Sequence, residues 1–270
     1  MIDCIDDWLA SCPDPATDPL AGMREAGLLD PAPDYATIAR IKAALVEHTG
    51  LLGVAGVWSG RQVVGRHFLS FGTDAERAEW SGRALAVAIS EPTVGAHPKL
   101  LTTRADKFEG VYRLAGQKAW VSNGLSADAI IVFAITAEDE GRKRYSAFIV
   151  PSDTPGLTMS DMPGFHALRP SKHCLLTLDG CLLPETAMLG DAGTAYERMA
   201  LPFRDIEDAV GTYATLGAFR HAIGLFAGAT TERTEDLGAL VALTAVFAAA
   251  SDCVVEALDD GQLQTGDATL

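Results

Sequence analysis

Hydrophobic positions in the first third of the chain recur at helical spacing. Ile38, Ile41 and Leu45 lie three or four positions apart in the segment DYATIARIKAALVEHTG, which predicts an amphipathic helix. A Thr-Asp capping signal opens the segment FGTDAERAEW and predicts a further helix. We therefore expect residues 1–83 to form an N-terminal helical domain.

From about residue 84 the pattern changes to short runs rich in β-branched residues, separated by turn signals. The continuous apolar run DAIIVFAIT is typical of a strand buried on both faces. Further strands are predicted in VYRLAGQKAWVS, RYSAFIVP and HCLLTLDGCLLP. Because no helical segments intervene, we expect residues 84–190 to form an antiparallel β-sandwich or barrel rather than a Rossmann sheet.

Helical periodicity returns after about residue 190. Two long helices are predicted, in RDIEDAVGTYATLGAFRHAIGLFAG and EDLGALVALTAVFAAASDCVVEALDD. The nearly apolar run at residues 237–250 is shorter than the roughly 20 residues that span a bilayer, so we expect it to be a buried helix. The order of elements predicts an α+β fold that ends in a short C-terminal helical domain at 191–270.

Charge and cysteine content exclude several function classes. The formal net charge of −15 disfavours partners with phosphate backbones, and it also disfavours anionic membrane surfaces. The five cysteines are scattered and form no CxxC pair, so no zinc site, other metal site or disulfide framework is predicted. The acidic start MIDCIDDWLASC is unlike a signal peptide, and a cytoplasmic location is expected.

The segment GQKAWVSNG places an indole at the end of a predicted strand. In one interpretation Trp120 fills the core and Ser122 is a turn residue. In the other, the strand end is a platform for a flat ligand with polar edges, since an indole face can stack on a ring and a hydroxyl can bond to its edge. The residues alone leave both interpretations open.

Five segments, taken in order, resemble those of the acyl-CoA dehydrogenase family of flavoproteins. They are REAGLLDP, HFLSFGTDAERAEW, ISEPTVGA, GQKAWVSNG and ALRPSKHCLLTLDGCLLPETAMLG. The resemblance implies FAD as cofactor, acyl-CoA or another acyl thioester as substrate, and oxidation of a CH–CH bond. It also implies the positions that contact the cofactor in the middle domain: Ile89, Ser90, Gly95, Ala96, Trp120 and Ser122.

In this family the indole packs on the flavin ring, and a hydroxyl two residues later bonds to its polar edge. The resemblance therefore assigns those roles to Trp120 and Ser122. Ile89 and Ser90 would offer backbone groups to the pyrimidine edge, and Gly95 would allow a close approach of the backbone. The family has a serine where this chain has Ala96, so one hydrogen bond to the ligand would be lost.

The reaction of this family needs a carboxylate that removes the α-proton of the acyl group. Glu207 falls at the position that isovaleryl- and long-chain-type members use for that base. The alternative is a solvated glutamate in the first turn of a helix, where the helix dipole favours it. Small residues follow on the same face at Gly211, Ala214 and Ala218, and they fit either a flat ligand or close helix packing.

Farther along, Arg233 aligns with the arginine that reaches the FAD pyrophosphate across a subunit interface in the family. Two departures accompany these matches. Asp208 replaces the arginine that follows the catalytic glutamate, and Asp236 with Leu237 replaces Phe-Gly. The resemblance also covers fewer C-terminal helices than the family has, and the part without a counterpart normally holds the adenine end of FAD.

Three functions stay open at this level. The first is a flavin-dependent dehydrogenase that acts on the CH–CH group of an acyl thioester. The second is a non-catalytic subunit of the same fold, paired with a full-length acyl-CoA dehydrogenase, and the third is a structural or binding protein without flavin. For the first two we expect a homo-dimer, a tetramer or a hetero-oligomer with a longer homologue, because the apolar run at 237–250 needs a cover.

Overall fold

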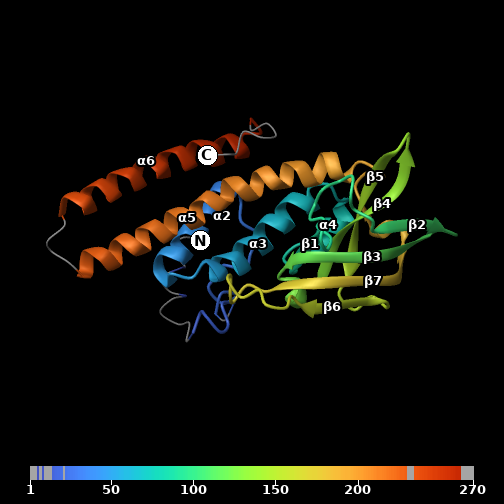
Figure 1. Cartoon of the computed structure of the whole chain (residues 1–270), viewed down its shortest axis with the longest axis horizontal. Helices are drawn as coiled ribbons and strands as arrows, with labels where there is room; N and C mark the ends of the chain where they lie inside the picture. The colour runs from blue at the N-terminus through green and yellow to red at the C-terminus, as the bar shows by residue number, and fades with distance from the viewer. Residues whose placement is uncertain (1–4, 6–7, 9–13, 21, 230–233, 263–270) are drawn as a thin grey trace. The chain divides into compact units, whose positions relative to one another are not determined.

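The computed structural model describes residues 5, 8, 14–20, 22–229 and 234–262 (Figure 1). Contacts divide the chain into two compact units. The first, called the helical unit, comprises Met1–Val63, Leu168–Pro170 and Arg204–Leu270, and the second, called the β unit, comprises Val64–Ala167 and Ser171–Phe203. The three domains that the sequence predicts, with boundaries after residues 83 and 190, stay a prediction.

The longer helices fall where the sequence predicts helical structure. They are α2 (Tyr35–Thr49), α3 (Leu52–Leu69), α4 (Asp74–Trp80), α5 (Leu201–Ala229) and α6 (Thr234–Asp259), with a π-helical turn at Tyr196–Ala200 before α5. The Asp34 side chain caps α2 by accepting a hydrogen bond from the Thr37 amide at 2.6 Å. At the other end of α2, Gly50 adopts the left-handed conformation of a helix C-cap, with φ 67°. The Thr73 side chain forms a capping box at the start of α4, as its sequence predicts.

Within the helical unit, α5 packs against α2 at a glycine. A Cβ added to Gly217 would lie 2.3 Å from the carbonyl oxygen of Ala43 and 2.9 Å from Cβ of Val46. The two backbones therefore meet at a distance that only glycine permits. This close helix packing lies at Gly217, which is not one of the small residues Gly211, Ala214 and Ala218 that the sequence analysis singled out.

We expect Gly217→Ala to lower the free energy of unfolding by about 1–3 kcal/mol, because the added methyl group overpacks the contact with α2. The matched control is Gly224→Ala on the same helix, where an added Cβ would meet no described atom within 4 Å. That change should be neutral or stabilise the protein by up to about 1 kcal/mol, through helix propensity alone. Urea unfolding of the two variants checks the prediction, and equal effects would contradict it.

One end of α6 is anchored in the helical unit. The Asp259 carboxylate accepts hydrogen bonds at 2.8 Å from the amides of Tyr35 and Ala36, and so caps the start of α2. The Tyr213 hydroxyl donates a hydrogen bond to Asp252, and Val255 is fully buried. The C-terminal part of α6 is therefore held by backbone amides of α2 and by the Tyr213 side chain of α5.

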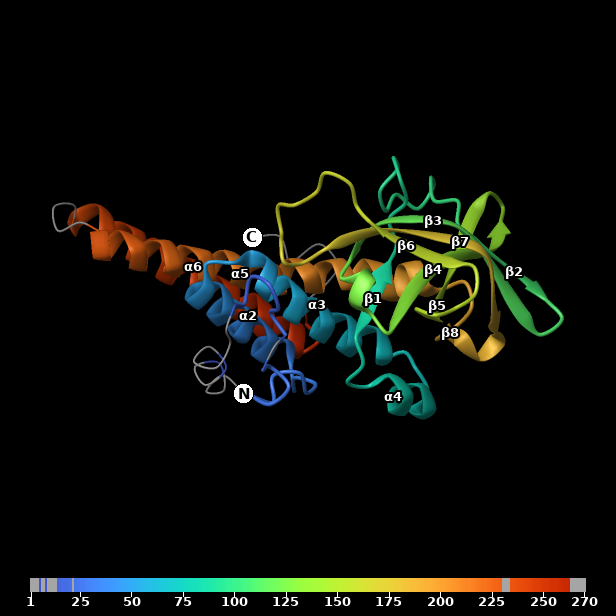
Figure 2. The ribbon, with the colours of Figure 1, turned by 90° about the horizontal axis from the view of Figure 1, so that it is seen from below.

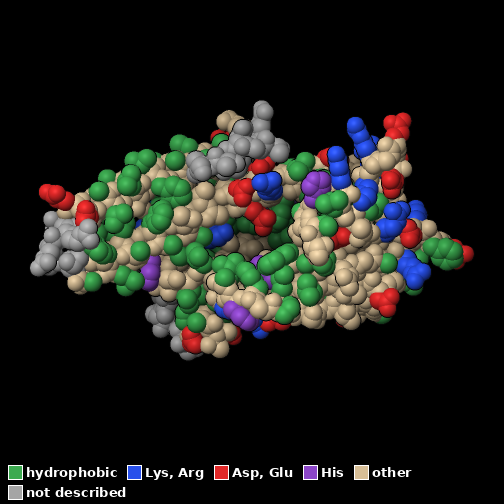
Figure 3. All heavy atoms as spheres, viewed as in Figure 1, with side chains coloured by type: hydrophobic (Ala, Val, Ile, Leu, Met, Phe, Trp, Pro, Cys, Tyr) green, Lys and Arg blue, Asp and Glu red, His purple; other side chains and the backbone are tan. Residues whose placement is uncertain are grey.

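The expectation that residues 237–250 form a buried helix is wrong for this chain by itself. Large apolar side chains are exposed along that part of α6, and others are exposed on α5: Phe219, Leu225, Leu240, Val241, Leu243 and Val246. Figure 3 shows hydrophobic side chains gathered over these two helices. Among the described residues, Glu235–Asp259 is also the one stretch long and apolar enough to cross a membrane, a test of length and composition that a helix covered by protein also passes.

The β unit contains a curved sheet in which β3, β7 and β6 run side by side (Figure 2). The strand order is β6-β7-β3-β2-β4-β5-β8, and β1 pairs with β4 off this path. The strands are β1 (Leu85–Ala88), β2 (Arg104–Phe108), β3 (Val111–Ser122), β4 (Ala129–Asp139), β5 (Arg142–Pro151), β6 (Leu157–Asp161), β7 (His173–Pro184) and β8 (Met188–Leu189). Short 3-10 turns follow β3 and β7, at Gly124–Ser126 and Glu185–Ala187.

The predicted α+β fold is confirmed, with one correction to the sheet. Most neighbouring strands are antiparallel, but β4 pairs in parallel with both β1 and β2. The connection from β1 to β4 contains β2 and β3, and it is long enough for the crossover that parallel pairing needs. The predicted burial of the DAIIVFAIT run is also confirmed, because residues 129–135 of β4 are buried.

Candidate functional site

Trp120 lies on a β-bulge near the end of β3. Lys118 pairs with Leu176 of β7 and Val121 pairs with Cys174, so two residues of β3 face one residue of β7. Trp120 has a φ of 60°, which is rare for a bulky residue and costs on the order of 1–3 kcal/mol. Its side chain is 48% exposed, so the interpretation of this residue as a core tryptophan is wrong. The bulge instead turns the indole outward.

Other rings and a hydroxyl group surround this indole. The ring of Phe165 meets that of Trp120 edge to face, with centroids 5.3 Å apart, and His173 is the third ring of the group. Ser122 follows Trp120 by two positions and is exposed. Its Oγ lies 3.0 Å from Nε2 of His173, the residue opposite it on β7. The strand end therefore offers an aromatic surface with a hydroxyl group beside it.

The segment after β1 lies directly against this strand end. The Ser90 carbonyl accepts a hydrogen bond from the Ala119 amide at 2.9 Å, and the Ile89 carbonyl accepts one from Nζ of Lys118 at 3.0 Å. The structure thus brings Ile89 and Ser90 together with Trp120, which lies next to Ala119 in the chain. Each of these carbonyls thus accepts one internal hydrogen bond that ties the segment to β3.

Gly95 and Ala96 lie in the tight turn that follows. Glu91 and Gly95 exchange backbone hydrogen bonds of 2.9 and 3.1 Å, and Gly95 has a φ of 62°. A Cβ added at Gly95 would meet no described atom within 4 Å, so open space lies beside it. The Ala96 carbonyl accepts a hydrogen bond from the Tyr196 hydroxyl at 3.0 Å. Glycine is therefore required here by the turn, and the space beside it can admit a ligand.

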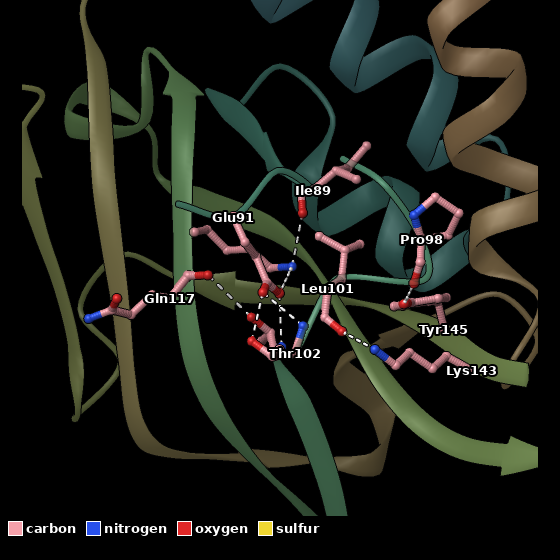
Figure 4. Close-up of polar contacts among 10 residues, drawn as sticks. Ile89, Glu91, Pro98, Leu101, Thr102, Gln117, Lys143 and Tyr145 are labelled. Carbon is pink, nitrogen blue, oxygen red and sulfur yellow. Dashed lines mark hydrogen bonds and ion pairs between the residues drawn. The ribbon is translucent and has the colours of Figure 1, made fainter. Parts of the chain in front are cut away.

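A buried ion pair holds this segment in place (Figure 4). Nζ of Lys118 lies 3.1 Å from Oε1 of Glu91, and these two side chains are 0% and 4% exposed. The Glu91 carboxylate also accepts hydrogen bonds at 2.8 Å from the amides of Thr102 and Thr103 and from the Thr102 hydroxyl. A single carboxylate therefore connects the loop after β1, the strand β3 and the residues that lead into β2.

Both members of the pair are charged at neutral pH. Burial by itself raises the pKa of Glu91, but the Lys118 ammonium and the donors of Thr103 and Thr102 outweigh burial and lower that pKa to about 2. Burial lowers the pKa of Lys118 to about 8, against the attraction of Glu91. Neutral pH lies between these two values, so the ion pair persists there.

Glu207, the predicted base, belongs to the helical unit and lies near the start of α5. Glu207 is an exposed residue, but protein atoms near its carboxylate displace part of the surrounding water, and this desolvation raises its pKa to about 7. Lys42 on α2 opposes the shift, and the neighbouring Asp208 adds to it. The same loss of water lowers the pKa of Lys42 to about 8. One turn beyond Glu207, a Cβ added at Gly211 would meet no described atom within 4 Å.

The alternative of a solvated glutamate in the first turns of a helix stays open, because Glu207 is exposed in the described structure. The open space at Gly211 shows that close packing does not explain this glycine, in contrast to Gly217. Arg233, the predicted pyrophosphate ligand, lies outside the described residues. Within the described part of the chain, no group of three or more His, Cys, Asp or Glu side chains could hold a metal ion.

Several residues of these sites were missed by the sequence analysis. Lys42 had a local signal, since it lies four positions after Ile38, within the apolar side of α2. Lys118 lies inside the GQKAWVSNG segment, but only the fold pairs it with Glu91. His173 had no local signal, because its position opposite Ser122 depends on the register between β3 and β7.

Comparisons with known proteins agree with this fold and these motifs. Residues 86–181 match the family model described as "Acyl-CoA dehydrogenase, middle domain". An acyl-CoA dehydrogenase of Bacillus subtilis (strain 168) is 37% identical over 134 residues, which are 47% of this chain and 35% of the relative. The 2-methylacyl-CoA dehydrogenase of Solanum tuberosum mitochondria is 35% identical over 108 residues, 40% of this chain and 26% of the relative. The matched part is thus about a third or less of the length of these relatives.

Solved structures resemble the chain over a longer span. The glutaryl-CoA dehydrogenase of Mycobacterium smegmatis has a TM-score of 0.80 at 23% identity, covering 97% of this chain and 73% of that one. At this level of identity the likeness shows the fold. The family model, the sequence relatives and the fold agree: residues 86–181 match the middle domain of the acyl-CoA dehydrogenase family, and the longer span shares the fold of its solved structures.

Proposed function

We propose that this chain binds FAD at the end of β3 and acts in the flavin-dependent oxidation of the CH–CH group of an acyl thioester. The observation that carries the proposal is the half-exposed indole of Trp120, held outward by a bulge at a strained φ of 60°. Such strain persists only where the surrounding structure maintains it. A flat ring system is the kind of ligand that gains from an outward-facing indole.

The residues present fit this cofactor. The indole of Trp120 would support one face of the flavin, and the Ser122 hydroxyl would bond to a polar edge of its ring. The amide N–H groups of Ile89 and Ser90 would face the pyrimidine edge, and Gly95 has open space beside it. The chemistry that oxidised FAD supplies is the acceptance of a hydride from the β-carbon of the acyl group.

Glu207 would be the base in this reaction. With a pKa of about 7 it is a stronger base than an ordinary carboxylate, and it is still largely ionised above neutral pH. It would take the proton from the carbon next to the thioester carbonyl while the hydride leaves the neighbouring carbon. The proton stays on the carboxylate of Glu207 until it is released to water.

We also propose that the exposed apolar side chains of α5 and α6 are covered by self-association or by a longer homologue. Leu243 and Val246 are among the most exposed of these side chains. An exposed apolar surface of this kind is typical of a protein interface. The cytoplasmic location expected from the sequence remains part of this proposal.

The test is the visible spectrum of the purified chain after gel filtration, with and without added FAD. We expect FAD to co-elute with the protein in stoichiometric amount. The apparent mass derived from the elution volume should exceed the 28.4 kDa of the monomer. Trp120→Ala should weaken FAD binding at least about tenfold, because the ring contact is lost. The matched control is Phe108→Ala, which removes an exposed aromatic side chain from β2 and should leave FAD binding unchanged.

Two outcomes would count against the proposal. If the chain by itself is colourless and takes up no FAD, the proposal is wrong. If FAD binding then appears only when a longer homologue is added, the alternative of a non-catalytic subunit is favoured. Equal FAD affinity of Trp120→Ala and the unaltered protein would show that the cofactor lies elsewhere.

A further inference from the structure

His173 contacts Ser122 through one ring nitrogen, and its other ring nitrogen is buried. Nε2 lies 3.0 Å from the Ser122 Oγ, across the register of β3 and β7. Nδ1 is buried and has no hydrogen-bond partner in the described structure. The ring is also held by Phe165, whose centroid lies 4.8 Å away at an angle of 75°. The imidazole is therefore fixed in place with only one of its nitrogens hydrogen-bonded.

This environment selects one tautomer. A proton on Nδ1 would leave a buried N–H without an acceptor, and orphaned buried N–H groups are rarer in proteins than under-used acceptors. The proton therefore belongs on Nε2, from which it points at the Ser122 Oγ. Burial also lowers the pKa of His173, which keeps the ring neutral at neutral pH. A neutral ring avoids a second buried N–H at Nδ1.

The direction of this hydrogen bond determines what Ser122 can offer a ligand. A hydroxyl group has one proton to donate and two lone pairs that accept. When His173 donates to the oxygen, the hydroxyl proton is not used between these two residues. It is then available to the outer side of the strand end, where Trp120 is exposed.

We propose that His173 is a positioning residue that commits the Ser122 hydroxyl to act as a hydrogen-bond donor toward the bound ligand. This inference rests on the proposed function, since FAD is the ligand assigned to that strand end. The hydrogen bond from His173 makes the Ser122 hydroxyl selective for acceptor atoms of a ligand, a selectivity that a freely rotating hydroxyl lacks. The atom that meets Ser122 must be an acceptor, such as an unprotonated ring nitrogen or a carbonyl oxygen, because an N–H group would face another proton.

The test combines three variants with two measurements. His173→Phe keeps a ring of similar shape, removes the donor, and removes the orphaned buried nitrogen, so the variant should fold. His173→Gln keeps an amide donor near the position of Nε2. Ser122→Ala removes the hydroxyl group. FAD affinity is measured by titration for each variant and for Ser122→Ala combined with His173→Phe.

We expect His173→Phe to weaken FAD binding about five- to tenfold, the scale of one directed hydrogen bond, and His173→Gln to restore most of it. In the Ser122→Ala background, His173→Phe should have no further effect, because the group that it orients is gone. Unaltered affinity of His173→Phe, or effects of the two single changes that multiply in the double variant, would overturn the proposal.

The second measurement needs no cofactor. Imidazole ¹⁵N NMR of the chain without added FAD should show His173 as the Nε2–H tautomer, and the Nδ1–H tautomer would overturn the inference by itself. A chain that binds no FAD would defeat the proposed function, and the role of His173 toward FAD with it. A chain that binds FAD but shows no effect of His173→Phe would defeat only the role of His173.

Discussion

Lys118→Met should lower the free energy of unfolding by about 3–5 kcal/mol, the largest effect on stability that we expect for a single change in the β unit. The change leaves the Glu91 carboxylate buried without its counter-charge, although Thr102 and Thr103 still donate to it. Urea unfolding measures the loss. The matched control is Lys107→Met, which breaks an ion pair of 2.9 Å with Glu185 between half-exposed side chains. That exposed pair should contribute less than about 1 kcal/mol.

The pH dependence of stability gives a second measure if Lys118→Met does not fold. The pKa of Glu91 is about 2 in the folded protein and 4.5 ordinarily, so the unfolded chain binds the proton more tightly. The stability that the carboxylate contributes is complete above about pH 4.5 and is lost as the pH falls toward 2. Glu91→Gln should lack this component. Two results together would contradict the importance of this ion pair. The first is an equal loss of stability in Lys118→Met and Lys107→Met, and the second is the same pH dependence of stability in Glu91→Gln and in the unaltered protein between about pH 2 and 4.5.

Glu207→Gln should reduce turnover of an acyl-CoA substrate by at least about 100-fold while FAD remains bound. The amide cannot take up the α-proton, but its shape is nearly that of the carboxylate. In the unaltered protein, turnover should rise with pH through a midpoint near 7, where Glu207 loses its proton. The control is Asp208→Asn, which should retain turnover with a midpoint at lower pH, because Asp208 raises the pKa of Glu207. Turnover of Glu207→Gln near the normal rate would show that the base is another residue.

A measurement of stability tests the pKa of Glu207 without any substrate. Since this pKa is raised from 4.5 to about 7, the folded protein binds the proton more tightly than the unfolded chain. The stability contributed by the protonated group is therefore present below about pH 4.5 and is lost as the pH rises through about 7. Glu207→Gln should lack this decline, and a parallel decline in both proteins would mean that the carboxylate is not perturbed.

The elements that the sequence predicts well are those with strong local patterns. The helix α2 follows from the spacing of Ile38, Ile41 and Leu45, and β4 follows from one unbroken apolar run. The parallel pairing of β4 could not be predicted, because it depends on where β1 and β2 attach after the chain has crossed over. Local pattern thus predicts elements, and the order of pairing needs long-range contacts.

The candidate sites were also predictable only in part, because local sequence identifies residues and long-range contacts determine their surroundings. The motif segment drew attention to Trp120 and Ser122, but the exposure of the indole comes from a bulge set by the register with β7, about 50 residues later. The raised pKa of Glu207 comes from desolvation by the fold and from Asp208, and it persists although Lys42 of α2 opposes it. The burial expected for residues 237–250 failed because apolar composition shows that a helix needs a cover, and does not show that the same chain provides it.

The outward turn of Trp120 also gives the protein an intrinsic optical probe. Trp8, Trp58 and Trp80 are buried, and Trp120 is the half-exposed indole among the four tryptophans. Water-soluble collisional quenchers should therefore reach the emission of one residue selectively. Any molecule that covers the end of β3 would shield that fraction of the fluorescence, so occupancy can be followed without a label and without waiting for catalysis.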